Sequence, residues 1–354
     1  MQRVLAINPG ATSTKFAVFE GEAAVVRETL EHRPEDLRPF DSVMDQQSFR
    51  LACLVSALER LSVPLQGLSA VVARGGLLRP VAGGVYSVNE LMVQELRTAA
   101  NGEHASNLGA VLARCLSERL GIPAFVVDPV SVDEMEPEAR ISGLPELPRV
   151  SLSHALNSKA VARKVAGQMG KRYEDVNLIV AHLGSGISVS PHRRGRMIDV
   201  NNAQEEGPFA PDRCGGLPAK MLVKLCYSGN YTEKQMLEKI MGSGGMCAYL
   251  GTRDIREAEV RADAGDELAS AVLDAMAYQV AKEIGAMAAA LSGDVDRIVI
   301  TGGMARSART VNAITRRVAF IAPVTIVPGE EELEALAAGA FRVLRGEEQP
   351  QQYQ

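Results

Sequence analysis

The most constraining feature of this chain is a pair of apolar runs, near its start, that flank a short polar segment. One run at 4–7 leads into the turn residues Pro9 and Gly10, and a second run follows at 16–19. This pattern predicts a β-hairpin with a polar tip. Such a tip suits an anion, because glycine lets backbone amides come close while hydroxyls and a lysine donate hydrogen bonds to phosphate oxygens. The expected phosphate-binding residues are Gly10, Thr12, Ser13, Thr14 and Lys15.

The same plan recurs in the second half of the chain. An apolar run at 178–183 is followed by a Gly/Ser tip and an alternating strand, and the expected phosphate-binding residues are His182, Gly184, Ser185 and Gly186. The first tip is not a Walker loop, because no glycine stands immediately before Lys15. The second is not a Rossmann fingerprint, because Val189 stands where its third glycine would be. Two such hairpins, one in each half, predict a duplicated domain with a nucleotide in the cleft between the copies.

The pattern of helices and strands predicts an α/β fold. Helical periodicity or capping signals favour helices at 46–60, 108–120, 155–169 and 266–291, and short apolar runs favour strands at 70–73, 124–127, 197–200 and 297–300. This alternation is typical of the α/β class. A proline-rich stretch at 137–148 is the candidate boundary between domains at 1–148 and 149–332. The C-terminal helical segment 333–354 is expected to complete the first domain, with residues 347–354 disordered.

Composition narrows the class of protein. A chain of 354 residues is long enough for two domains, and its net charge of −5 argues against a general nucleic-acid binder. Five cysteines without a C-x-x-C pair indicate reduced thiols rather than disulfides or a zinc site. We find no signal peptide and no apolar stretch long enough to span a membrane, so a cytoplasmic location is expected.

Other candidate residues stand at the ends of predicted strands. Arg74 precedes two glycines, and Arg213 lies in a Gly/Pro-rich loop; arginines in such places suit oxyanions, although a surface arginine is usually only solvated. Asp128 either caps a turn or organises a metal. His154 begins a helix, where capping or packing is the more common role.

Two segments near the C-terminus have alternative interpretations. Thr301-Gly302-Gly303 is either a strand-to-helix turn or a backbone seat for the sugar or base of a nucleotide. The acidic run 330–332 suits a helix N-terminus, and one of its carboxylates would also suit Mg²⁺ held by nucleotide phosphates.

Taken in this order, the motifs resemble those of the acetate and propionate kinase (acetokinase) family, within the sugar kinase and actin superfamily. The resemblance covers nearly the whole chain, and the segments at 8–15 and 199–209 are most similar to the branch that acts on butyrate. It implies two duplicated actin-like (ribonuclease H-like) ATPase domains flanking a cleft. It also implies ATP-dependent, reversible phosphorylation of a short-chain fatty acid, most similar to conversion of butanoate to butanoyl phosphate. Mg²⁺ as cofactor and a homodimer or higher homo-oligomer are further implications.

The resemblance also implies roles for single residues. Arg74 and Arg213 match two catalytic arginines, Asp128 matches a catalytic aspartate, and His154 matches a histidine that contacts the transition state. The residues that match the supports of Mg²⁺ are Asn8 and Glu331, the latter in an ambiguous register within the acidic run. One departure is Ala11, which stands where the family usually has serine.

The acyl chain of the substrate needs a small apolar wall, for which Leu77, Phe209 and Pro211 are the candidates. Two alternatives remain open for the function. The chain is instead an acetate, propionate or branched-chain acid kinase, or it is a non-catalytic actin-like protein that binds ATP. The second alternative does not explain why two arginines, an aspartate and a histidine are kept together with the phosphate motifs.

Overall fold

The computed structural model describes residues 2–354, which divide into two units. Unit 1 holds the residues up to Val132 together with Glu331–Gln354, and unit 2 holds Asp133–Glu330. Each unit is built around one β-sheet, and the expected α/β class is confirmed. The change from unit 1 to unit 2 comes before the proline-rich stretch, and the return to unit 1 falls inside the acidic run 330–332.

The sheet of unit 1 has seven strands in the order β12-β5-β6-β4-β1-β2-β3. The predicted hairpin is confirmed, because β1 pairs with β2 in antiparallel fashion; on its other side β1 is parallel to β4, and β4 is parallel to β6. The strands are β1 (Arg3–Pro9), β2 (Ser13–Glu20), β3 (Ala23–Glu31), β4 (Ala70–Arg74), β5 (Val85–Ser87), β6 (Ala124–Val127) and β12 (Gln351–Gln352).

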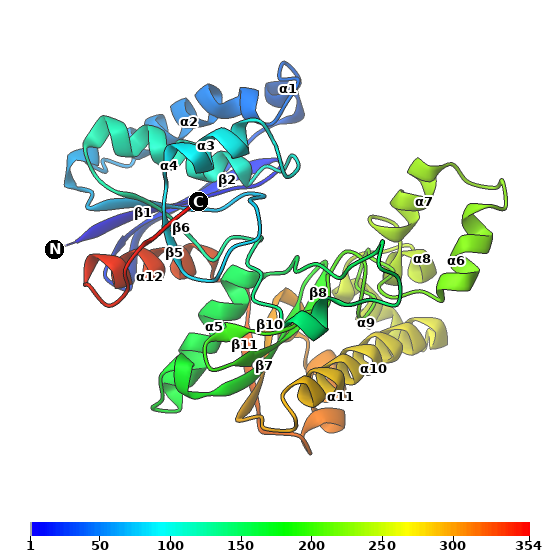
Figure 1. Cartoon of the computed structure of the whole chain (residues 1–354). Helices are drawn as coiled ribbons and strands as arrows, with labels where there is room; N and C mark the ends of the chain where they lie inside the picture. Colours follow the sequence, from blue (N-terminus) through cyan, green and yellow to red (C-terminus); the bar gives the residue numbers. More distant parts are fainter. Residues whose placement is uncertain (1) are drawn as a thin grey trace. The chain divides into compact units, whose positions relative to one another are not determined.

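Helices cover both faces of this sheet. In Figure 1 the helices α2, α3 and α4 lie on one face, and the red helix α12 lies on the other. Asn89 caps α3 by accepting from the Met92 N–H, and α4 ends at Gly121, which has a left-handed φ of 67°. The helices are α1 (Pro34–Leu37), α2 (Gln47–Arg60), α3 (Glu90–Arg97), α4 (Asn107–Leu120) and α12 (Glu332–Leu344).

The sheet of unit 2 repeats the strand order of unit 1. Its order is β11-β10-β7-β8-β9, which corresponds strand for strand to β6-β4-β1-β2-β3. Here too the first strand, β7, is antiparallel to β8 and parallel to β10. The strands are β7 (Asn177–Leu183), β8 (Ile187–Arg193), β9 (Arg196–Met197), β10 (Arg297–Gly302) and β11 (Val324–Pro328). The shared order supports the prediction of a duplicated fold.

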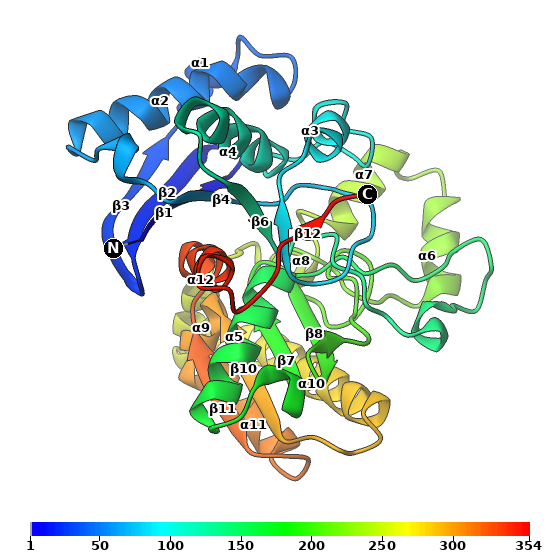
Figure 2. The same ribbon diagram turned by 60° about the vertical axis from the view of Figure 1, so that its left-hand side comes forward.

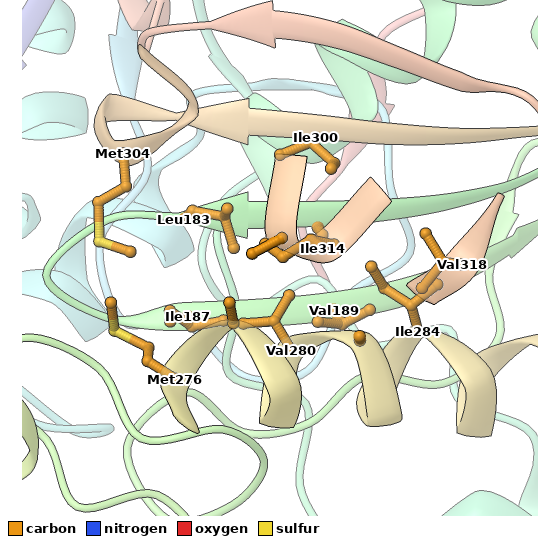
Figure 3. Packing of buried hydrophobic residues seen from close by; sticks show 14 of the residues in the cluster. Leu183, Ile187, Val189, Met276, Val280, Ile284, Ile300, Met304, Ile314 and Val318 are labelled. Carbon is orange, nitrogen blue, oxygen red and sulfur yellow. The ribbon is translucent and has the colours of Figure 1, made fainter. Parts of the chain in front are cut away.

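A large apolar core holds unit 2 together. Figure 3 shows Met276, Val280 and Ile284 of α10 packed against Ile187 and Val189 of β8. The helix α11 joins this face, while α5 covers the opposite face through a separate cluster. The helices are α5 (Ala155–Gln168), α6 (Ala219–Cys226), α7 (Glu233–Ile240), α8 (Gly245–Leu250), α9 (Ile255–Asp263), α10 (Glu267–Ala290) and α11 (Ala308–Val318).

The chain crosses between the two units twice, and each crossing leads into a helix that packs on the sheet of the unit it enters. After β6 of unit 1, the next α-helix is α5, which packs on the sheet of unit 2. After β11 of unit 2 the chain returns as α12, which packs on β1 and β4. Figure 2 shows α12 against the sheet of unit 1 and α5 beside β7.

Two expectations about local structure were wrong. The strand expected at 197–200 ends at Met197, because the chain then turns and the Val200 carbonyl accepts from a side chain instead of a neighbouring strand. The tail is ordered: β12 pairs with β5, and Tyr353 is 3% exposed. Among the described residues, no helix has the length and apolar character needed to cross a membrane.

We predict that one buried histidine makes unit 2 sensitive to acid. His192 is fully buried between Tyr173 and Ser190, and burial, with smaller contributions from Lys159 and Arg163, lowers its pKa well below 6.5. The unfolded chain takes up this proton below about pH 6.5 while the folded chain does not. The free energy of unfolding should therefore fall on acidification below that pH, by up to about 1.4 kcal/mol per pH unit.

Urea unfolding of the parent and of His192→Gln between pH 7 and pH 5 checks this prediction. Glutamine keeps polar atoms but cannot take up the proton, so the variant should show the shallower dependence. Equal slopes in the two proteins would contradict it.

Candidate functional site

Three candidate residues of unit 1 stand at one edge of its sheet. Asn8 is near the end of β1, Arg74 ends β4, and Asp128 directly follows β6. These strands are parallel neighbours, so their carboxyl ends lie at the same edge, where ligands of α/β proteins usually bind.

The acidic run contributes a carboxylate to this edge. Glu332, the first residue of α12, accepts a hydrogen bond from the Asn8 amide and forms an ion pair with Arg74 at 2.8 Å. The neighbour of Asn8 is thus Glu332, whereas the resemblance pointed to Glu331, which is the N-cap residue of the helix. Because three glutamates are adjacent, the sequence alone does not tell which of them lies beside Asn8. That depends on the residue at which α12 begins.

Asp128 has an unusual backbone conformation. Its φ is +38°, a region that few residues other than glycine adopt, and the residue is buried. Its carboxylate accepts from the Gly84 N–H at 2.7 Å, and its own N–H donates to the Gly84 carbonyl at 3.0 Å. Strained backbone maintained by such contacts occurs preferentially at functional sites. Asp128 is therefore a rigidly held acid at the edge that carries Arg74.

The first tip, residues 10–15, is a tight turn whose side chains face different ways. Gly10 donates its N–H to the Ser13 carbonyl at 2.8 Å. Thr12 and Lys15 are exposed, whereas Thr14 is buried and contacts His32 through its hydroxyl at 2.9 Å. Of the expected phosphate ligands, Thr14 thus faces the interior. Arg50 of α2 is also buried against this tip, a contact that sequence reasoning missed because an arginine in an amphipathic helix carries no distinguishing signal.

The second tip, residues 184–186, lies beside two stacked histidines. The rings of His154 and His182 are 3.8 Å apart and nearly parallel, at 12°. His154 Nδ1 lies 2.9 Å from the Ser188 hydroxyl, and His182 Nδ1 lies 2.8 Å from the side-chain oxygen of Asn157. An amide oxygen is only a hydrogen-bond acceptor, so this contact requires Nδ1 of His182 to carry a hydrogen and donate it.

The second ring nitrogen of His182, Nε2, faces the acidic run. Nε2 lies 3.1 Å from a carboxylate oxygen of Glu330, which becomes an ion pair when the imidazole is protonated. A Cβ at Gly184 would lie 3.1 Å from the same nitrogen, so a side chain there would crowd the contact. Two of the three glutamates therefore have separate partners, with Glu330 on His182 and Glu332 on Asn8 and Arg74.

Arg213 belongs to the same part of unit 2. Its guanidinium donates to the Ala203 carbonyl at 3.1 Å and lies directly over Gly186, where a Cβ would collide with it. Its nearest carboxylate, Asp212, is 3.9 Å away. Burial lowers the pKa of Arg213 despite that carboxylate, but an arginine remains charged in proteins. Arg213 thus places one guanidinium directly against the second tip of unit 2.

A second arginine, which sequence reasoning missed, holds the loop under Arg213. Arg149 binds the Glu206 carboxylate at 2.9 Å, the Asp199 carboxylate at 3.0 Å and the Val200 carbonyl at 2.9 Å. These contacts clamp both ends of the turn 199–206, whose Ala203 carbonyl receives Arg213. No sequence signal identifies Arg149, because the two carboxylates that it binds lie fifty or more residues away.

The residues 301–303 end β10 beside β7. Gly302 has a φ of +91°, and a Cβ there would collide with the Leu183 carbonyl, so a glycine is needed for this close approach. The Thr301 hydroxyl donates to the Gly329 carbonyl at 3.3 Å. Thr301 and Gly302 are buried, and Gly303 is the exposed member with open space above it. The close packing against Leu183 explains why residue 302 is a glycine, whereas Gly303 is accessible to a ligand.

The expected wall of the acyl pocket is not assembled within one unit. Phe209 packs in the core formed with α10, and its N–H donates to Gln279 at 3.1 Å. Pro211 is buried in the same unit, while Leu77 is half-buried in unit 1, where its N–H donates to Asn107 at 2.9 Å. Phe209 thus has a packing role of its own.

The side chains of unit 1 offer oxygen ligands for a hard cation. The Asn8 amide and the Glu332 carboxylate are adjacent, and these are the ligand types that Mg²⁺ prefers. In the part of the chain that the structure describes, no three His, Cys, Asp or Glu side chains gather as a metal cage. One or two carboxylates combined with substrate phosphates are a common way of holding Mg²⁺, so this donor set fits that ion.

Comparison with known proteins identifies the family. The model of the acetokinase family matches residues 151–326. The chain is 51% identical over 353 residues to the "Probable butyrate kinase 2" of Caldanaerobacter subterraneus, covering 100% of both chains. It is 49% identical over 352 residues to the "Butyrate kinase 2" of Clostridium acetobutylicum, covering 99% of both.

Solved structures show the same fold at lower identity. The acetate kinase of Porphyromonas gingivalis matches with a TM-score of 0.80 at 19% identity, over 97% of this chain and 100% of that one. A propionate kinase from Francisella tularensis matches with a TM-score of 0.73 at 17% identity, over 95% and 98%. With relatives of about half identity over its whole length, this chain belongs to the acetokinase family.

Proposed function

We propose that this protein is a butyrate kinase, which transfers the γ-phosphoryl group of ATP to the carboxylate of butyrate and yields butanoyl phosphate and ADP, reversibly. The observation that carries the proposal is the end-to-end match, at 51% and 49% identity, to two relatives with that name. The side chains described above supply the groups that such a transfer requires.

Phosphoryl transfer to a carboxylate is mainly a problem of charge. The carboxylate is already a nucleophile at neutral pH, but it is repelled by the γ-phosphate. Phosphoryl transfer is catalysed chiefly by alignment and by positive charge around the transferring oxygens. In the proposal Arg74 and Arg213 offset the repulsion, while His154 donates a hydrogen bond to the group in transfer. Ser188 supports the assignment of His154, because it fixes the orientation of that ring.

The nucleotide is assigned to the glycine-rich segments. Both tips donate hydrogen bonds to phosphate oxygens, and the accessible backbone at Gly303 receives the adenosine. Asn8 and Glu332 would hold Mg²⁺, with Asp128 positioning its water ligands, and Glu331 stays the alternative in the acidic run. When bound, the ion neutralises charge on the phosphates.

Two alternatives are weighed against this proposal. An acetate, propionate or branched-acid kinase would use the same phosphate groups and differ only around the acyl chain. A non-catalytic ATP-binding protein would need the glycine-rich segments but not the arginines and His154. The names of the relatives favour the butyrate kinase over both.

We further infer that the protein works in the cytoplasm. Its five cysteines, all among the described residues, are free thiols, as is usual in a reducing compartment. Its proposed substrates ATP and butyrate are both small soluble anions.

The first test of the proposal is a substrate panel. Acetate, propionate, butyrate and isobutyrate are incubated with ATP and Mg²⁺, and acyl phosphate is trapped as the hydroxamate. Each buried methylene contributes about 0.8 kcal/mol, or about fourfold, so kcat/KM for butyrate should exceed that for acetate by about tenfold or more. A higher kcat/KM for acetate would favour the first alternative, and no acyl phosphate from any acid would favour the second.

We predict that Arg213→Ala lowers kcat far more than it weakens ATP binding. A group that stabilises charge mainly in the transition state contributes to kcat, and its loss typically costs about 3 to 4 kcal/mol, or a few hundredfold. Arg213→Lys should recover little, because an ammonium does not reproduce the planar fork. Initial rates and ATP affinity are measured, with Arg253→Ala as control because Arg253 is an exposed arginine of the same unit. A loss of kcat below about threefold would remove Arg213 from the reaction.

The proposed enzyme forms a homodimer or higher homo-oligomer through the surface of α6 and its neighbours. No residue of α6 is buried, although Met221 and Val223 are large and apolar, and Tyr227 beyond it is 88% exposed. Large exposed apolar patches mark interaction sites. The double variant Met221→Glu, Val223→Glu should be smaller than the parent by light scattering, whereas Val260→Glu, an exposed position on α9, should not change size. A monomeric parent would refute the assembly.

A further inference from the structure

Arg50 is a fully buried arginine whose side chain is satisfied mainly by the first tip. It lies on α2 with no exposed surface, and its hydrogen bonds account for all five N–H donors of a guanidinium. Nη1 donates to the carbonyls of Gly10 at 2.8 Å and Ser13 at 2.9 Å, and Nη2 donates to the carbonyl of Ala11 at 3.0 Å. The remaining acceptors are the Thr14 hydroxyl and the side chain of Gln46.

These acceptors are all neutral. Among the described residues no carboxylate lies within ion-pair distance of Arg50, and the pKa of its guanidinium is lowered by burial, against a small opposing effect of Cys53. The Cys53 thiol is not a counter-ion, because burial raises its own pKa. A buried charge without an opposite charge is costly, and loss of one partner of a buried pair typically costs several kcal/mol. The apo protein thus keeps a positive charge directly behind the first tip.

The same contacts determine where the backbone amides of the tip point. In a trans peptide the carbonyl and the following N–H point in opposite directions, and the structure has no cis peptide bond among its described residues. Because the Gly10 and Ala11 carbonyls face Arg50, the N–H groups of Ala11 and Thr12 face away from it. Both residues are exposed, and neither N–H has a hydrogen-bond acceptor within the described part of the chain.

We propose that Arg50 is a positioning residue for phosphate binding, which fixes the first tip with two N–H groups presented outward and whose buried charge is compensated by a phosphate group of the bound nucleotide. This inference rests on the proposed function, because the anion is a phosphate of ATP or ADP. Arg50 does not touch the ligand: it acts through the peptide groups of Gly10, Ala11 and Thr12.

The proposal also explains the departure at Ala11. If the tip binds phosphate through backbone N–H groups that Arg50 orients, a side-chain hydroxyl at position 11 is dispensable, and alanine provides the same amide as serine. Ala11 is exposed, in agreement with this, so burial in a core does not account for the alanine.

The test compares a ligand with phosphates and one without them. Calorimetric Kd values for ADP and adenosine are measured for the parent, Arg50→Met, Arg50→Lys and Arg60→Met. Arg60 is the matched control, an exposed arginine at the other end of the same helix. We expect Arg50→Met to weaken ADP binding about tenfold or more, the loss typical of a charged hydrogen-bonding group, and to change adenosine binding less than about twofold. Arg50→Lys, which keeps the charge but not the fork, should fall between the parent and Arg50→Met.

Each outcome is decisive. Unchanged ADP affinity in Arg50→Met overturns the inference, and so does an equal loss for ADP and adenosine, which would indicate a general structural role. If Arg50→Met fails to fold, the decision passes to Arg50→Lys: parent-like ADP affinity there overturns the inference, and a loss confined to ADP supports it. A parent that binds neither ligand instead refutes the proposed function, and the inference falls with it.

Discussion

The site depends on one interior strand in each sheet, β1 in unit 1 and β7 in unit 2, which is paired with a neighbour on both sides but in opposite senses. β1 and β7 are fully or almost fully buried, antiparallel to the next strand on one side and parallel to a distant strand on the other. The antiparallel side forces a tight turn, which is the tip. The parallel side brings the end of β4 or β10 to the same edge. The same arrangement of one antiparallel and one parallel neighbour occurs in each unit. Within each unit, it brings the tip and the end of the parallel strand to the same edge of the sheet.

The arginines described above differ in the charge of their hydrogen-bond acceptors. Arg149 and Arg74 face carboxylates, whereas the hydrogen bonds of Arg50 and Arg213 go to neutral acceptors, chiefly backbone carbonyls. A carbonyl orients a guanidinium without cancelling its charge, and so its field remains available to an anion. A carboxylate orients it more strongly but neutralises it. By this difference Arg149 holds a loop in place, whereas Arg50 and Arg213 have no carboxylate within hydrogen-bonding distance among the described residues. Arg74, proposed above to act on the phosphates, is paired with Glu332, which is itself a proposed ligand of Mg²⁺.

Local patterns in the sequence predicted much of the fold, and long-range pairing accounts for the rest. Both hairpins and the helices near 47–60, 107–120 and 267–290 were predicted to within one or two residues, because turn residues and periodicity are local signals. The order of the C-terminal tail was not predicted, because β12 is held by pairing with β5, more than 250 residues away in the sequence.

The same division applies to the candidate site. Arg74, Asp128 and the two tips were singled out because they follow apolar strands. Arg50 and Arg149 were not, because their importance lies in carbonyls and carboxylates that only the folded chain brings to them. The partner of Asn8 in the acidic run likewise required knowing where α12 begins.

The two crossings between the units have a consequence for the order in which the chain matures during synthesis. Unit 1 begins first, yet the helix that covers one face of its sheet lies in Glu331–Gln354, which is synthesised after the whole of unit 2. Unit 2 is a single continuous stretch and is complete before that. The nascent chain must therefore carry an uncovered face of β1 and β4 until α12 has been synthesised, and the unit that begins first is completed after the other.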